Sequence, residues 1–225
     1  MTFSISARCA RTGMFGIAVS SSSPCVAARC AHARAGVGVV ATQNITDPML
    51  GPRGLDLLAE GLSAAQVMDR FAAEAPHFAY RQVVVLDKQG RSAGHSGRET
   101  LGKHRIAQGP NVAAAGNLLA VEDVPDKMVQ AFLADPEAHL GDRIVAAMRA
   151  AVAAGGEEGP VHSAGMVLVR DVGWPVADLR IDWVEADPVA ALAALWQLWH
   201  PQLDAYVARA LDPTAAPSYG VPGDE

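Results

Sequence analysis

The sequence predicts an α+β protein built as a four-layer αββα sandwich, with two antiparallel sheets stacked face to face and helices covering their outer faces. Two observations predict it. Apolar strand patterns are joined by hairpin turns, and helical patterns arrive in pairs between groups of strands. The chain shows no recurrent strand–helix–strand unit and no glycine-rich phosphate loop, so we do not expect a doubly wound fold. An arrangement with one sheet stays open.

Length and charge limit the classes of function. The chain has 225 residues and 50% hydrophobic content, which suffices for one core, so we expect one domain over residues 1–212 and a loose tail over 213–225. The net charge is -6 and the 18 basic residues are scattered, which disfavours nucleic acid as a partner. No long apolar run or basic leader is present, so we expect no membrane association and a cytoplasmic protein.

Three cysteines, Cys9, Cys25 and Cys30, are an odd number, and reduced thiols are expected. Cys25, Cys30 and His32 are a partial set of metal ligands. A structural zinc site needs four ligands at tighter spacing, so the sequence predicts no metal site. No cofactor is expected either.

The first strand begins at the start of the chain. Residues 2–7 alternate between polar and apolar side chains, residues 11–13 supply a turn, and residues 16–20 form the returning strand. Loss of Met1 would expose Thr2, whose hydroxyl is a nucleophile and whose own α-amine is a general base. The alternative is that Thr2 is an ordinary strand residue after a start methionine.

A second buried strand, residues 36–43, ends in polar side chains. Thr42 and Gln43, followed by Asn44, place three uncharged hydrogen-bonding groups where the apolar pattern stops. They either form the edge of a pocket or lead into a loop at Asp47. Both interpretations remain open from the sequence.

The rest of the chain alternates between helices and strands. A helix at 55–60 ends at a glycine, and Ser63 with Gln66 forms a capping box for the next helix. The remaining expected elements are strands at 80–86 and 91–97, a strand ending in a turn at Asn117, helices at 124–133 and 142–154, strands at 164–169 and 176–184, and a last helix capped at Asp187 and interrupted at Pro201.

Several short segments, in this order and spacing, resemble a bacterial and archaeal family known as domain of unknown function 1028 (DUF1028). The segments are residues 2–5, 16–19, 33–38, 41–43, 51–56, 80–83, 116–120, 163–164 and 178–182. Members of that family have the fold of N-terminal nucleophile (Ntn) hydrolases. The resemblance therefore implies an αββα sandwich related to amide-cleaving enzymes.

The resemblance implies an amidohydrolase that cleaves a linear C–N bond of a small molecule. Thr2 would attack the carbonyl carbon to form an acyl-enzyme, with Ser21 as a catalytic neighbour, and Asn117 with a backbone N–H would stabilise the oxyanion. Arg34 or Arg53 would bind a substrate carboxylate. Helix capping by Arg53 and a simple turn at Asn117 are the structural alternatives.

Four further residues complete the expected substrate site: Thr42, Gln43, His162 and Ser163. We expect their strand ends to converge on Thr2. The chain departs from the family pattern at two places, with serines at 20–23 where relatives often have Ser followed by Lys or His, and with His162 where many have Gln. Substrate preference is therefore expected to differ.

A second class of function is an inactive Ntn-fold binding or scaffold protein that retains Met1, because an acylated amine cannot act as a base. In either class we expect a homodimer. The stripe of Trp196 and Trp199, or the alanine-rich segment 25–35, offers apolar surface for it.

Overall fold

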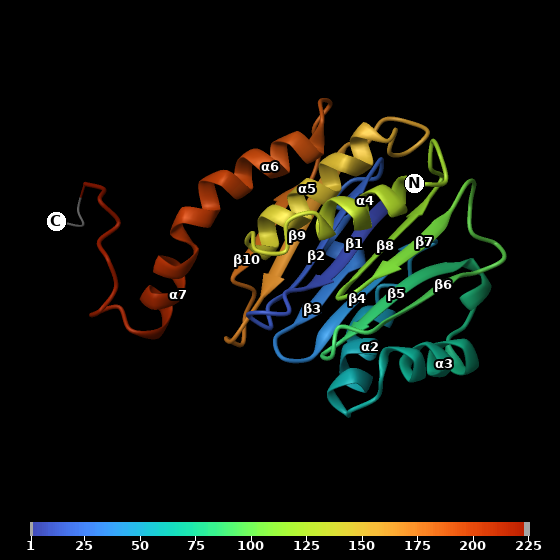
Figure 1. The fold of residues 1–225 in the computed structure, drawn as a ribbon, viewed down its shortest axis with the longest axis horizontal. Coiled ribbons are helices and arrows are strands. Elements are labelled where there is room, and N and C mark those ends of the chain that lie inside the picture. Colours follow the sequence, from blue (N-terminus) through green and yellow to red (C-terminus); the bar gives the residue numbers. More distant parts are fainter. Residues whose placement is uncertain (1, 223–225) are drawn as a thin grey trace.

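The computed structural model of the chain, which describes residues 2–222, contains two stacked antiparallel sheets (Figure 1). The larger sheet has six strands in the order β10-β9-β2-β1-β8-β7, and the smaller has four in the order β3-β4-β5-β6. The strands are β1 (Thr2–Arg8), β2 (Phe15–Ser21), β3 (Ala31–Arg34), β4 (Gly38–Asn44), β5 (Arg81–Asp87), β6 (Ser92–Ser96), β7 (Arg105–Gly109), β8 (Val112–Asn117), β9 (Ser163–Val169) and β10 (Ala177–Ile181).

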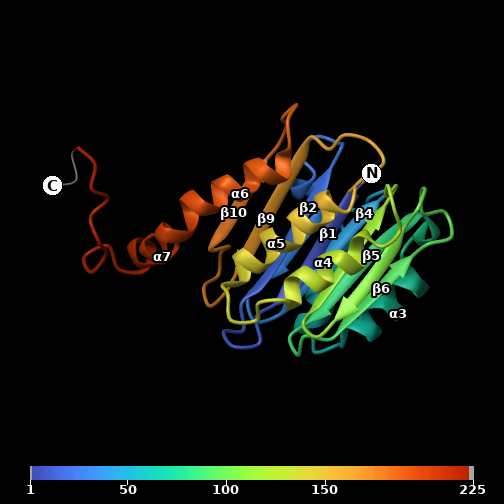
Figure 2. The ribbon, with the colours of Figure 1, turned by 45° about the horizontal axis from the view of Figure 1, so that its top comes forward.

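Helices cover the outer faces of both sheets (Figures 1 and 2). The helices are α1 (Ala27–Cys30), α2 (Leu50–Ala59), α3 (Ala64–Glu74), α4 (Val124–Leu133), α5 (Leu140–Ala153), α6 (Pro188–Trp199) and α7 (Leu203–Leu211). The helices α4, α5 and α6 pack on the six-stranded sheet, and α2 and α3 pack on the four-stranded sheet. The predicted four-layer α+β sandwich is therefore confirmed.

Side-chain alternation along each strand explains the layers. In β1, Phe3 and Ile5 join the apolar core under the helices, whereas Ser4 points between the sheets. The layer between the sheets is mainly aliphatic, with Ile17 and Leu86, and it also contains Phe15. Each sheet is thus apolar on both faces and needs a cover on each side.

Helix boundaries follow the predicted capping residues. Ser63 and Gln66 form the expected capping box at the start of α3, and Asp187 caps α6 through the backbone N–H groups of residues 189 and 190. Pro201 lies in a 3₁₀ turn between α6 and α7, which confirms the predicted interruption.

Two edge strands, β3 and β7, were not predicted. Within β7 only Ala107 is fully buried, so its pattern does not stand out from a loop. The strand β3 has no fully buried residue, and it follows the one-turn helix α1 in the alanine-rich segment. Among the described residues, no helix is long and apolar enough to cross a membrane.

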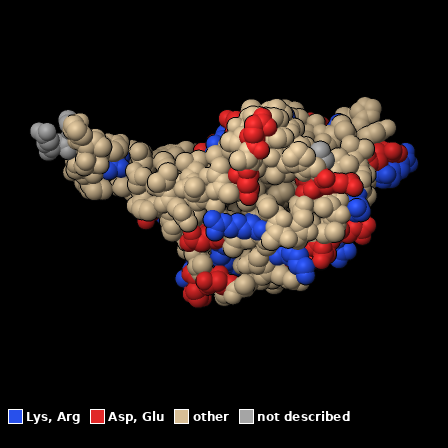
Figure 3. All heavy atoms as spheres, turned by 90° about the horizontal axis from the view of Figure 1, so that it is seen from above, with Lys and Arg blue, Asp and Glu red and all other residues tan. Residues whose placement is uncertain are grey.

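The surface agrees with the scattered charge of the sequence. On the face drawn in Figure 3, the Lys and Arg side chains lie among Asp and Glu side chains and do not form a continuous patch. The C-terminal arm, which contains α7, projects from the body of the molecule and carries little charge on that face (Figures 1 and 3).

We predict that Phe71→Ala destabilises the fold by about 3–5 kcal/mol, the usual cost of removing a buried phenylalanine. Phe71 is 0% exposed and contacts Phe78 with ring centroids 6.3 Å apart. Urea unfolding would measure the loss. Asp69→Ala, an exposed position on the same helix, is the control and should change stability little; equal effects of the two substitutions would contradict the packing described for α3.

We propose that the protein is a homodimer that buries the end of α6 and part of the C-terminal arm. Trp196 is only 2% exposed and belongs to the core of its own chain, and the Trp199 indole donates to the carbonyl of Val176 at 3.0 Å. Leu198 and Leu211, which are 69% and 64% exposed, remain as apolar surface. We predict a dimer by light scattering at micromolar concentration and a monomer for Leu198→Glu; a monomeric wild type would contradict the proposal.

Candidate active site

Thr2 lies at the start of a central strand, between two polar neighbours. It is 6% exposed and faces Asn117 of β8 in the strand register. On its other side, the hydroxyls of Thr2 and Ser21 are 3.4 Å apart, and Ser21 faces Ser163 of β9. Four of the predicted site residues therefore lie in one row at one end of the six-stranded sheet.

A buried network of amide side chains joins this end of the six-stranded sheet to the other sheet. Ser4 donates to Gln43 Oε1 at 2.6 Å, and Gln43 Nε2 donates to Gln82 Oε1 at 2.7 Å. Asn117 Nδ2 donates to the same Gln82 oxygen at 3.1 Å, and Gln82 Nε2 donates to the Gly116 carbonyl at 2.9 Å. Gln43 thus reaches the row of polar residues from β4 through hydrogen bonds.

Asn117 is buried and keeps donor capacity, and its Oδ1 has no hydrogen-bond partner among the described residues. Its amide nitrogen carries two hydrogens, and one hydrogen bond to Gln82 accounts for one of them. Leu118 follows in the left-handed conformation, with φ +51, which costs about 1–2 kcal/mol for an L-residue. The Leu118 N–H donates to the Leu101 carbonyl at 3.0 Å, which helps to fix the turn.

Glu157 closes the space beyond the start of β1. Its backbone pairs with Leu119, which continues from β8, and its carboxyl group lies beside Ser22, which continues from β2. Ser22 lies beside the carboxyl group, but neither carboxyl oxygen makes a hydrogen bond of ordinary geometry with another described residue. Burial raises the pKa of Glu157 from 4.5 to about 8, although the nearby Ser22 lowers it in part.

A cavity of about 390 Å³ reaches Glu157 from the side of the helices. Its wall includes Phe3, which follows Thr2 in the chain, and three acidic residues, Glu157, Glu185 and Asp187, but no Lys or Arg. The volume lies in the usual range for a small-molecule site. Glu185 and Asp187 carry negative charge beside the largely protonated Glu157, so the lining favours a positively charged group over a carboxylate.

Thr42 does not share the orientation of Gln43. Adjacent residues of a strand point to opposite faces, so the Thr42 side chain is turned toward the helical layer of α2 and α3. There it is 0% exposed and its hydroxyl donates to the Asp47 carbonyl at 3.1 Å. The structure therefore does not bring the Thr42 side chain to the row of polar residues.

The structure brings neither predicted arginine to this row. Arg34 faces Gly38 at the opposite end of β4 from Gln43, on the order of 17 Å away at the usual rise per residue, and pairs with Asp56 at 2.9 Å. Arg53 lies on α2 and pairs with Glu74. Both guanidinium groups are thus engaged by carboxylates away from the row of polar residues.

His162 lies at the rim of the row. Its backbone N–H donates to the Ser21 carbonyl at 2.9 Å, but its ring stacks on Trp183 with centroids 4.2 Å apart. Ser163, the next residue, donates its hydroxyl to the Ser23 carbonyl at 2.6 Å. These bonds fix the loop that follows Ser21.

Sequence reasoning missed Gln82 and Glu157. The signal for Gln82 was an uncharged polar residue at the beginning of an apolar strand, where it is 0% exposed. Glu157 stands among the glycines and proline of residues 155–160, and nothing in that local pattern indicates its burial.

Comparison with known proteins places the chain in a family without an assigned function. The structure matches the crystal structure of protein SPO2555 from Silicibacter pomeroyi, which carries the same family name, with a TM-score of 0.81, 28% identity and 88% of each chain covered. A weaker likeness is to Anbu (ancestral beta-subunit) from Yersinia bercovieri, with a TM-score of 0.41, 10% identity, and 91% of this chain and 97% of that chain covered.

No curated protein matches the chain. The sequence profile of DUF1028, a family of unknown function, matches residues 2–192. The chain belongs to the DUF1028 family.

Proposed function

We propose that the protein is an Ntn-type hydrolase that cleaves small amides, with Thr2 as the nucleophile after removal of Met1. The observation that carries this proposal is the position of Thr2 at the start of β1, between Asn117 and the hydroxyl of Ser21. A nucleophile at a chain terminus supplies its own base, so no His or Lys is required beside it.

The proposed reaction proceeds through an acyl-enzyme. Thr2 Oγ1 attacks the carbonyl carbon while its proton passes to the α-amine, and the spare N–H of Asn117 stabilises the oxyanion. The C–N bond then breaks, and the leaving amine takes the proton from the α-ammonium. Water next attacks the ester carbonyl and gives up a proton to the α-amine, which returns it to Thr2 as the ester bond breaks.

Glu157 serves as a positioning residue for the amine in this proposal. Its carboxyl group lies between the continuations of β2 and β8, the two strands that flank β1, so it faces the start of β1. In the Met-free chain this start is the Thr2 α-amine. A hydrogen bond from the amine to Glu157 would turn the nitrogen lone pair toward the Thr2 hydroxyl, and the two groups would titrate as a coupled pair.

The substrate we propose is a small amide with a positively charged group near the scissile bond. The cavity that reaches Glu157 is lined by acidic residues and by no Lys or Arg, so it suits an ammonium group. Amides of amino-bearing acids or of diamines have this charge. N-acyl amino acids and ureido acids, which carry a carboxylate instead, form the comparison series.

We predict that Thr2→Ala lowers kcat by at least about 1,000-fold while Thr2→Ser retains turnover, because only the second keeps a hydroxyl nucleophile. Hydrolysis of both substrate series by Met-free protein is the measurement. Ser6→Ala is the matched control and should stay near wild type, because Ser6 is buried on the same face of β1 and its hydroxyl has no partner among the described residues.

The amino terminus gives an independent prediction. A form extended by a few residues before Thr2 should be inactive, because its first amine is no longer on Thr2 and an amide nitrogen is not a base. Equal turnover by the extended and the Met-free forms would exclude Thr2 as the nucleophile. If both forms bind the substrates without turnover, the protein is instead a binding or scaffold protein. The structure does not bear on whether Met1 is retained, because Met1 lies outside the described residues.

We predict that Glu157→Gln stabilises the protein above neutral pH. The folded-state pKa of about 8 exceeds the ordinary 4.5, so the folded state holds this proton more tightly. The contribution of the protonated Glu157 to the free energy of unfolding is complete below pH 4.5 and is lost as the pH rises toward 8. The variant should exceed wild type by on the order of a few kcal/mol near pH 8 and match it near pH 4.5.

Urea unfolding across that pH range measures the difference. The exposed neighbour provides a matched control, because Glu158→Gln removes the same charge one residue away and should shift stability little at any pH. Parallel pH profiles for wild type and Glu157→Gln would contradict the burial of a protonated carboxyl group at this position.

A further inference from the structure

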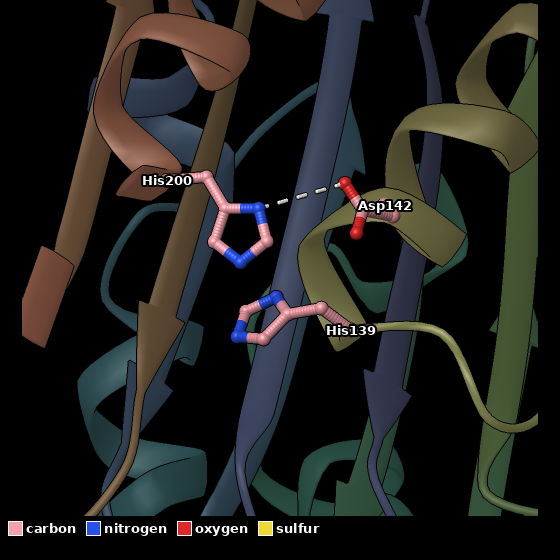
Figure 4. A group of neighbouring side chains, drawn as sticks. All are labelled: His139, Asp142 and His200. Carbon is pink, nitrogen blue, oxygen red and sulfur yellow. Dashed lines mark ion pairs between the residues drawn. The ribbon is translucent and has the colours of Figure 1, made fainter. Parts of the chain in front are cut away.

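A cluster of three metal-ligating side chains lies far from Thr2. His139 caps the start of α5, Asp142 follows in its first turn, and His200 comes directly after α6. Each offers one ligand atom, and these atoms all lie within 4.8 Å of one another. Figure 4 shows the two imidazole rings and the carboxylate gathered around one small space.

Hydrogen bonding and stacking hold this cluster in place. The Trp196 indole N–H donates to Asp142 Oδ1 at 2.7 Å, which orients the carboxylate as an outer-shell partner does in metal sites. The His200 ring stacks on Trp196 with centroids 4.6 Å apart, and its centroid lies 4.5 Å from that of the His139 ring. The cluster therefore joins the first turn of α5 to the residue that follows α6.

His139 has one hydrogen bond that a metal ion could replace. The His139 ring is half-buried beside the ring of His200. In the structure, His139 Nδ1 accepts the capping hydrogen bond from the Gly141 N–H at 3.1 Å. A metal ion at that nitrogen would compete only with this single bond between neutral groups.

A cavity of about 190 Å³ opens beside the cluster and is lined by both histidines and by Cys9 and Met14. Cys9 follows the end of β1, so the cavity lies about 24 Å from Thr2 at the usual rise per residue. The cluster is therefore separate from the candidate active site.

We propose that His139, Asp142 and His200 bind one divalent transition-metal ion, of which Zn²⁺ is the best match, with an open coordination position toward the cavity. Two imidazoles and one carboxylate are ligands that Zn²⁺ accepts, and three protein ligands leave a position for water or a small ligand. Tetrahedral coordination at about 2.0–2.2 Å separates ligand atoms by roughly 3.4 Å. Side-chain rotations that move the ligand atoms by about an ångström would bring them to this separation. The half-exposed side chains of Asp142 and His200 have room to move.

Such an ion would join the start of α5 to the end of α6, where the C-terminal arm begins. Because binding to the folded state alone stabilises it, Zn²⁺ at 100 times its Kd should raise Tm by about 5–10 °C. This effect does not depend on Thr2 or on hydrolysis. The proposal therefore stands or fails separately from the proposed function.

The test uses the full chain, stripped with a chelator and titrated with Zn²⁺ by calorimetry and thermal unfolding. Every protein in the set carries Cys25→Ser, because an exposed thiol also binds Zn²⁺. We expect one Zn²⁺ per chain in the parent, and at least about a 100-fold loss of affinity in His200→Ala and Asp142→Asn. His139→Asn should lose affinity too while still capping α5.

Two controls separate this site from general histidine binding. His104→Ala removes an exposed histidine outside the cluster and should leave both affinity and the Tm shift unchanged. Mg²⁺, which prefers oxygen ligands, should give no shift. Absence of one-to-one Zn²⁺ binding, retention of affinity in His200→Ala, or an equal loss in His104→Ala would each overturn the proposal.

Discussion

The side-chain amide of Gln82 is the interaction on which the arrangement of the two sheets depends. It accepts hydrogen bonds from Gln43 and Asn117 and donates to the Gly116 carbonyl and to Ser96. A buried amide without these partners would cost about 1–3 kcal/mol for each unsatisfied group. The apolar layer around it provides attraction without direction, so the amide network sets how β5 lies across β8.

This constraint also determines the geometry around Thr2. Asn117 faces Thr2 in the strand register, and its side chain is fixed by the bond to Gln82 on the other sheet. The left-handed Leu118 shows that the backbone accepts strain at this point. A donor held from two sheets does not need to reorganise when charge develops beside it, which is the property an oxyanion site requires.

The sequence allowed the fold to be predicted more fully than the site, for physical reasons. Periodicity identifies buried faces, and it located the first hairpin and α4 with its bounds at Val124 and Leu133. It does not tell which end of a strand meets which neighbour, so it could not show that Arg34 of β3 pairs with Gly38, at the opposite end of β4 from Gln43. Single buried polar residues leave no periodic pattern, so Gln82 and Glu157 received no role. The metal-ligand cluster was concealed by sequence separation, because its members meet only when α6 packs on α5.

Glu157 and the two arginines differ in burial and in their partners. Arg34 and Arg53 pair with carboxylates at the surface, where an ion pair contributes little and its loss matters little. Glu157 is buried beside a cavity, and its carboxyl oxygens have no hydrogen-bond partner among the described residues. A buried acid of this kind lowers stability at neutral pH, and a fold has no structural reason to keep it. We propose that Glu157 is kept because of its position beyond the start of β1. A free amine or a cationic substrate at that place would pair with its carboxylate.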